Sequence, residues 1–208
     1  MAALAQAERL ALCDLFDQVG PAAPTLCGGW LTADLAAHLV VREHNPAAVP
    51  GAVAPTGPLA AYTDRLTRQQ RDSVGYPELV DRLRAGPPLL GLFGLPGPRE
   101  WLNLHEFFVH HEDVRRPAGQ QPRPLGTALE QALWRRLRGL APILLRPPAG
   151  IAVELMSPDG AVARAGRGSD RIRVSGPIGE LFLYAYGRRT AAQVEVSGDP
   201  AALARFDS

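Results

Sequence analysis

The chain has 208 residues, of which 46% are hydrophobic and 21% are charged, a composition that is typical of a globular protein and argues against disorder. Its 22 basic residues, all of them arginine, nearly balance 21 acidic residues, so the net charge of +1 offers no basic field for a nucleic-acid backbone. The absence of lysine also excludes a mechanism that uses a lysine Schiff base or a P-loop lysine.

The cysteines and the apolar stretches indicate the cellular setting. Cys13 and Cys27 form no CxxC pair and cannot build a disulfide framework, which favours a reducing cytoplasm. The segment MAALAQAERLALCDLFDQVG has no basic residues ahead of an apolar run, so we expect no signal peptide. The apolar stretches are too short to span a bilayer. We therefore expect a cytoplasmic protein with no membrane partner and no nucleic-acid partner.

Up to residue 146 the chain carries apolar residues at helical spacing, interrupted by turns rich in Gly and Pro. The pattern predicts helices over residues 2–19, 33–43, 59–73, 77–85, 98–115 and 126–145. Thr32 stands at the expected N-cap of the second helix, and Asn45-Pro46 ends that helix. Pro98 suits the first turn of the fifth helix.

After Pro147-Pro148 the apolar period becomes that of short strands separated by turns. Strands are predicted over residues 151–157, 162–166, 171–176 and 192–198, and helices within residues 176–189 and 199–206. Asp199 is the expected N-cap of the terminal helix. The predicted fold class is mainly α, with a helical domain over residues 1–146 followed by a small α+β domain over residues 150–208.

One apolar segment, AGPPLLGLFGLPGP, is punctuated by Gly and Pro and covers residues 85–98. Three interpretations of it stay open. The segment lines a pocket, it contacts a second copy of the chain in a homodimer, or it covers the helical core as a lid.

The stretch NLHEFFVHHEDVRR, residues 103–116, holds the densest set of titratable groups in the chain. Glu106, His110 and Asp113 stand at i, i+4 and i+7, which places them on one face of a helix. A carboxylate and an imidazole one turn apart can bind the same metal ion, as in helical bundles that carry carboxylate–histidine sites. His38, in the middle of an apolar helix, is the natural third ligand because an unpaired imidazole there would be costly.

A structural interpretation competes with the metal site. A single histidine in an apolar helix is more often a hydrogen-bonded core residue, and the Glu-x-x-x-His spacing arises by chance in charged helices. The neighbouring His105, His111 and Glu112 point away from the Glu106–His110 face, so we assign them to solvent or to helix packing. Arg115 and Arg116 favour the helix macrodipole. Spacing alone leaves the choice open.

Two stretches of this sequence resemble a known family. LCGGWLTADLAAHLVVRE and EFFVHHEDVRR are similar to the metal-binding N-terminal domain of the mycothiol-dependent maleylpyruvate isomerase family, a branch of the DinB-like four-helix bundles. Within it, the chain most resembles a subgroup described only as metal-binding. The tail GPIGELFLYAYGRRTAAQVEVSGDPAAL resembles the family's small C-terminal domain, which is similar to a sterol-carrier-like fold. The matched residues of the first domain are Trp30, Asp34, His38, Glu106, His110 and Asp113.

The resemblance implies that His38, Glu106 and His110 bind a divalent ion, with Zn²⁺ as the expected metal. Two histidines and one carboxylate leave an open position, which is typical of a reactive zinc site. Asp113 would orient His110 as a hydrogen-bond acceptor. Asp34 would do the same for His38, or it is simply a first-turn acid at a helix N-terminus. Trp30 is expected to pack rather than to contact a substrate.

The function that the resemblance implies is a mycothiol-dependent thiol transferase or isomerase. The open metal position would activate the small-molecule thiol, which adds to an electrophilic substrate. Arg42, one turn beyond His38, would contact an anionic substrate or the thiol, or it is an exposed arginine with no such role. Neither Cys13, within an apolar stripe, nor Cys27, in a Gly-rich turn, is expected to be a nucleophile.

Two alternative functions stay open. In a metal-dependent hydrolase the same three ligands would activate water, and Glu43 or Asp113 would have to be the general base. In a non-catalytic protein they would only bind a metal ion or a small ligand.

Overall fold

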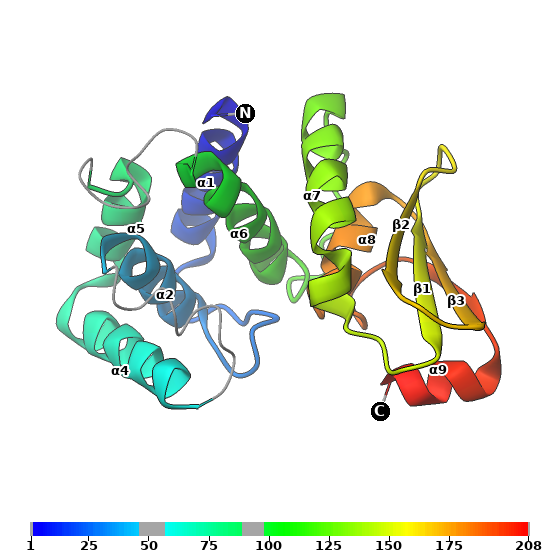
Figure 1. Ribbon diagram of the computed structural model, residues 1–208. Coiled ribbons are helices and arrows are strands. Elements are labelled where there is room, and N and C mark those ends of the chain that lie inside the picture. The colour runs from blue at the N-terminus through cyan, green and yellow to red at the C-terminus, as the bar shows by residue number, and fades with distance from the viewer. Residues whose placement is uncertain (1, 46–56, 89–97, 208) are drawn as a thin grey trace. The chain divides into compact units, whose positions relative to one another are not determined.

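The computed structural model describes residues 2–45, 57–88 and 98–207 (Figure 1). Within these residues the chain is mainly helical, with one small sheet in its C-terminal part, which confirms the predicted class at this level. The elements are α1 (Ala2–Val19), α2 (Thr32–His44), α4 (Pro58–Ser73), α5 (Tyr76–Ala85), α6 (Pro98–Arg115), α7 (Thr127–Leu145), β1 (Ile151–Met156), β2 (Val162–Gly166), β3 (Asp170–Ser175), α8 (Ile178–Ala185), β4 (Glu195–Gly198) and α9 (Pro200–Asp207).

The described residues form two compact units that divide between Gln120 and Gln121. The first contains α1, α2, α4, α5 and α6. In it, α1 packs on α5 and α6, and α2 packs on α4 and α5. Its core consists of apolar side chains that repeat at helical spacing, as the amphipathic pattern requires. The largest of them are Leu12, Phe16, Leu35, Leu39, Leu79, Leu83 and Phe107.

The second unit contains α7 to α9 and the sheet. Its strands lie in the order β2-β1-β3-β4; β1 is antiparallel to β2 and parallel to β3, and β4 is antiparallel to β3. Alternation along β2 and β3 buries one face of the sheet and exposes the other, whereas β4 is exposed throughout. On the face opposite the core, the Glu154 carboxylate is covered by three arginines of β2 and β3 and accepts hydrogen bonds from them. The buried face carries Val153, Leu155, Ala163, Ala165, Ile172 and Val174.

The two compact units divide before α7, whereas the sequence pattern predicts the domain boundary after residue 146. This helix buries Leu129, Leu133 and Leu137, and it packs on β2 and α8 within the second unit. The change from helical to strand periodicity marks a change of secondary structure, and it does not say which elements the last helix covers.

Several local predictions can be compared directly. The predicted helices and strands are present with small shifts at their ends, and the last strand is shorter than expected. Asp199 caps α9 as expected, because its Oδ1 accepts from the N–H groups of Ala201 and Ala202. Most of the apolar segment over residues 85–98 lies outside the described residues. None of the described helices combines the length and the apolar character that crossing a membrane requires.

Candidate metal centre

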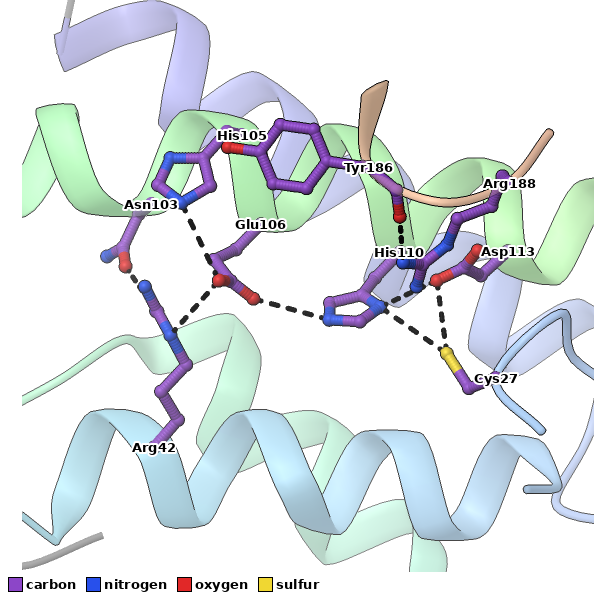
Figure 2. A network of polar contacts seen from close by, with 9 residues as sticks. All are labelled: Cys27, Arg42, Asn103, His105, Glu106, His110, Asp113, Tyr186 and Arg188. Atoms are coloured by element: carbon purple, nitrogen blue, oxygen red, sulfur yellow. Dashed lines mark hydrogen bonds and ion pairs between the residues drawn. The ribbon is translucent and has the colours of Figure 1, made fainter. Parts of the chain in front are cut away.

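Two helices of the first unit present the candidate ligands to one another. Leu35 and Leu39 of α2 are fully buried, so His38 lies on the neighbouring edge of the helix and is half-buried. On α6 the buried Phe107 anchors the helix and leaves Glu106 and His110 one turn apart on the side that faces α2. Figure 2 shows both of these side chains pointing from α6 toward α2.

The ligand atoms of His38, Glu106 and His110 all lie within 4.8 Å of one another. His110 Nε2 is 3.3 Å from Glu106 Oε2 (Figure 2). The rings of His38 and His110 meet at 75°, with centroids 5.8 Å apart. Two ligands of a tetrahedral Zn²⁺, each about 2.1 Å from the ion, are about 3.4 Å apart. The Glu106–His110 pair already has this spacing, and a ligand atom of His38 lies within 4.8 Å of both, so the three residues could hold one divalent ion.

His38 is in the neutral protonation state that a metal ligand requires. Burial lowers the pKa of His38 to about 4, and the positive charge of His110 acts in the same direction. Among the described residues the His38 ring makes ring contacts and no hydrogen bond. The neutral imidazole therefore keeps a lone pair for an ion at neutral pH.

Glu106 and His110 form a charged pair. Burial alone would raise the pKa of Glu106, but the Arg42 guanidinium and His110 outweigh it and hold this pKa well below its ordinary value. Burial would likewise lower the pKa of His110, but hydrogen bonds with Asp113, Cys27 and Glu106 raise it well above its ordinary value. A metal ion must therefore displace a proton from His110.

Asp113 contacts the nitrogen of the His110 ring that does not face Glu106. It is fully buried, and its Oδ2 is 2.9 Å from His110 Nδ1 (Figure 2). When Nδ1 donates its proton to this carboxylate, Nε2 is the nitrogen left to face Glu106. A carboxylate in this position orients a metal-binding histidine.

Asp34 does not reach His38. Its Oδ2 accepts a hydrogen bond from the N–H of Leu31 at 3.0 Å, and its Oδ1 pairs with Arg71 of α4 at 2.5 Å. These contacts favour the helix-terminus interpretation over a role as acceptor for His38. The expectation that Thr32 caps α2 is wrong, because the Thr32 hydroxyl donates to the Gly20 carbonyl instead.

Arg42 is buried, so its interpretation as an exposed arginine is wrong. Its Nη1 donates to Asn103 Oδ1 at 2.7 Å, and its Nε lies 3.7 Å from Glu106 Oε1 (Figure 2). The Asn103 amide in turn donates to Glu43 Oε1 at 2.8 Å. Both oxygens of Glu43 accept from Arg9, at 2.5 and 2.6 Å. A chain of polar contacts thus runs from the helical core to the candidate ligand Glu106.

The expectation that His105 points away from the Glu106–His110 face is wrong, because its Nε2 lies 3.6 Å from Glu106 Oε1. Two other titratable residues of α6 take part in packing. His111 Nδ1 is 3.6 Å from Glu8 Oε2 of α1, and both residues are buried. Glu112 is buried and accepts from Arg115 at 2.9 Å and from Arg116 at 2.7 Å. Of the two expectations for these residues, solvent or packing, packing is the one that the contacts favour.

Cys27 is the residue of this site that spacing did not predict. Its Sγ donates to Asp113 Oδ2 at 3.1 Å and lies 3.8 Å from His110 Nδ1 (Figure 2). A turn holds it there, because the N–H of Trp30 donates to the Cys27 carbonyl at 2.7 Å and Gly29 adopts a φ of 81°. The ring centroid of Trp30 is 5.1 Å from that of His38, so the same turn also packs on a candidate ligand.

Sequence comparison yields no further assignment, because no family model and no curated protein match the chain. Two solved structures do match: a crystal structure of the mycothiol-dependent maleylpyruvate isomerase and one of its histidine-to-alanine mutant. They are 16% and 17% identical in sequence, both with a TM-score of 0.57, and each match covers 94% of this chain and 90% of the other. Similarity at this level concerns the fold. The chain therefore shares the fold of the mycothiol-dependent maleylpyruvate isomerase.

Proposed function

We propose that the chain is a mycothiol-dependent thiol transferase or isomerase with a divalent metal ion, Zn²⁺ in the first instance, at His38, Glu106 and His110. The observation that carries the proposal is the approach of three ligand atoms from α2 and α6 to within 4.8 Å. The fold match to a mycothiol-dependent isomerase supports the choice of thiol. The proposal includes a DinB-like four-helix arrangement for the first domain and a sterol-carrier-like C-terminal domain.

A divalent ion with an open position would lower the pKa of a bound thiol, so that the thiolate is available at neutral pH. The residues of the chain prepare the site for it. Neutral His38 and anionic Glu106 supply lone pairs, and Asp113 holds His110 by its Nδ1. Arg42 faces Glu106 Oε1, which leaves Oε2 toward His110.

The contacts of Arg42 favour a role in holding Glu106. The guanidinium already donates to Asn103 and lies beside Glu106. A direct contact between Arg42 and an anionic substrate or the thiol stays a prediction.

The hydrolase alternative has less support from the geometry. It needs a carboxylate that is free to take a proton from water. Glu43 is buried and held by Arg9 through both oxygens. Asp113 Oδ2 accepts from Cys27 and contacts His110 Nδ1. Neither carboxylate is placed as a general base in these contacts.

Two measurements test the proposal. The first is the metal content of purified protein, where His38→Ala is expected to lose the bound divalent ion. The matched control is His44→Ala, on the same helix, whose exposed ring has one hydrogen bond among the described residues, with the Val40 carbonyl. It should keep the ion. Equal metal content in both variants contradicts the site.

The second measurement adds mycothiol and either a chloro-dinitro arene or maleylpyruvate, and follows conjugate or isomer formation with and without a chelator. A metal-dependent product that His38→Ala fails to form is expected. Saturable mycothiol binding without any turnover would instead favour the non-catalytic alternative. No interaction with mycothiol would contradict the proposal.

A further inference from the structure

A second group of ligand atoms lies on the other edge of the His110 ring. Cys27 Sγ, His110 Nδ1 and Asp113 Oδ2 all lie within 4.8 Å of one another. The individual distances are 2.9 Å from Nδ1 to Oδ2, 3.1 Å from Sγ to Oδ2 and 3.8 Å from Sγ to Nδ1. Neither His38 nor Glu106 belongs to this group.

The group has a fixed geometry and a route to solvent. Asp113 is fully buried and His110 is 9% exposed, whereas Cys27 is half-buried. The Cys27 loop is tied to α6 by a hydrogen bond from the N–H of Leu26 to the Asp113 carbonyl, at 3.0 Å. An ion could therefore reach the thiol from solvent and meet donors that are already in place.

The donor set differs in kind from that of the first group of ligands, which consists of His38, Glu106 and His110. It combines a sulfur, an imidazole nitrogen and a carboxylate oxygen, a set typical of sites for thiophilic divalent ions. The thiolate and the carboxylate together carry two negative charges, which match a dication. The first group offers only one carboxylate and no sulfur.

We propose that Cys27, His110 and Asp113 form a second cation position, which binds a thiophilic divalent ion such as Cd²⁺ or Zn²⁺. Binding breaks the S–H bond of Cys27 and the N–H bond at Nδ1 of His110, forms a sulfur–metal and a nitrogen–metal bond, and releases both protons to solvent. The position uses Nδ1 of His110, whereas the first group uses Nε2. The inference depends on the distances around Cys27 and not on the proposed function.

The test is a titration of the metal-free full chain with Cd²⁺, which reports thiolate ligation through its ultraviolet sulfur-to-cadmium charge-transfer band. The band is expected to saturate in the wild-type protein. Cys27→Ser should lose the band and one equivalent of bound Cd²⁺. His38→Ala should keep the band, because His38 belongs only to the first group.

Cys13→Ala is the matched cysteine control. Cys13 is fully buried and its Sγ contacts the Val80 carbonyl, so this variant should keep the band. A band that persists in Cys27→Ser, or that disappears in Cys13→Ala with the fold intact, overturns the proposal. If a variant fails to fold, the wild-type protein decides: Cd²⁺ should slow the alkylation of Cys27 by iodoacetamide at least tenfold, and an unchanged rate overturns the proposal.

The outcomes also separate the two sites. A protein that keeps the charge-transfer band but has no ion at the first group contradicts the proposed function and leaves this inference standing. A protein that binds an ion through His38 but gives no charge-transfer band overturns this inference and leaves the proposed function standing.

Discussion

The carboxylate of Asp113 lies beside one nitrogen of the His110 imidazole, with Oδ2 2.9 Å from Nδ1, while the other nitrogen, Nε2, faces Glu106. A proton on Nδ1 leaves the lone pair on Nε2, which is the form that binds a metal ion. The pair therefore sets the tautomer as well as the direction of the ring.

Asp113→Asn is expected to weaken Zn²⁺ binding at the first group by about 10- to 100-fold, because the amide no longer draws the proton to Nδ1. The affinity is measured by competition with a chromogenic chelator. The measurement is made in a Cys27→Ser background, so that only one cation position contributes. An unchanged affinity would mean that Asp113 does not act through His110.

The pH dependence of metal binding follows from the same two histidines. The pKa of His110 is raised well above its ordinary value, and that of His38 is lowered to about 4. Below the raised pKa a proton competes with the ion for His110, so affinity falls as pH falls. Near neutral pH His38 is already neutral and adds no proton. The expected release is about one proton per Zn²⁺ in the Cys27→Ser background.

This release is measured with an indicator dye in weakly buffered solution. Between about pH 5.5 and the pKa of His110, the logarithm of the binding constant should rise by about one for each pH unit. A binding constant that does not change over this range would show that His110 is not a ligand.

Arg9 and Glu43 form a buried ion pair, whose side chains are at most 2% exposed. Arg9→Met leaves the Glu43 carboxylate buried, with the Asn103 amide as its remaining hydrogen-bond donor among the described residues. Loss of one member of a buried ion pair costs about 3–5 kcal/mol of the free energy of unfolding. Denaturant unfolding measures this loss.

The control for Arg9→Met is an exposed pair of the same chemistry. Glu78 accepts from Arg82 at 2.6 Å, and both side chains are largely exposed. Glu78→Gln should change the free energy of unfolding by less than about 1 kcal/mol. Similar effects from both variants would refute a special role for the buried pair.

The sequence predicts which side chains of this site meet more readily when they are close together in the chain than when they are far apart. Glu106 and His110 belong to one helix, so the spacing of four residues alone placed them together. His38 was a candidate because an imidazole in an apolar helix needs a partner. The family resemblance then supported this choice, since no local rule says which helix faces α6. Cys27 lies 83 residues before His110, and its short loop has no periodicity that points to the site.

The points that the sequence left open or predicted differently from the structure have the same physical origin. Asp34 had two possible roles, and the choice depends on Arg71, which lies 37 residues away on α4. The amphipathic face of α7 predicts that the helix is buried, but not that β2 and α8 cover it. Local propensity thus accounts for the elements, and tertiary pairing decides which side chains meet.

Cys13 provides a test of the core at alkaline pH. Burial raises the pKa of its thiol to about 12, from an ordinary value of 9.0. The folded state therefore holds its proton more tightly than the unfolded state does. The corresponding stability is fully present below pH 9.0 and is lost as pH rises toward 12.

Above about pH 9 the free energy of unfolding should fall by up to about 1.4 kcal/mol per pH unit through this one group. Cys13→Ala removes the thiol, so its stability should depend less on pH, although the smaller side chain lowers its starting value. Burial also raises the pKa of Tyr76 to about 12, and this contribution is common to both proteins. The difference between their slopes in denaturant unfolding isolates Cys13, and equal slopes would show that its thiol ionises as readily in the folded chain as in the unfolded one.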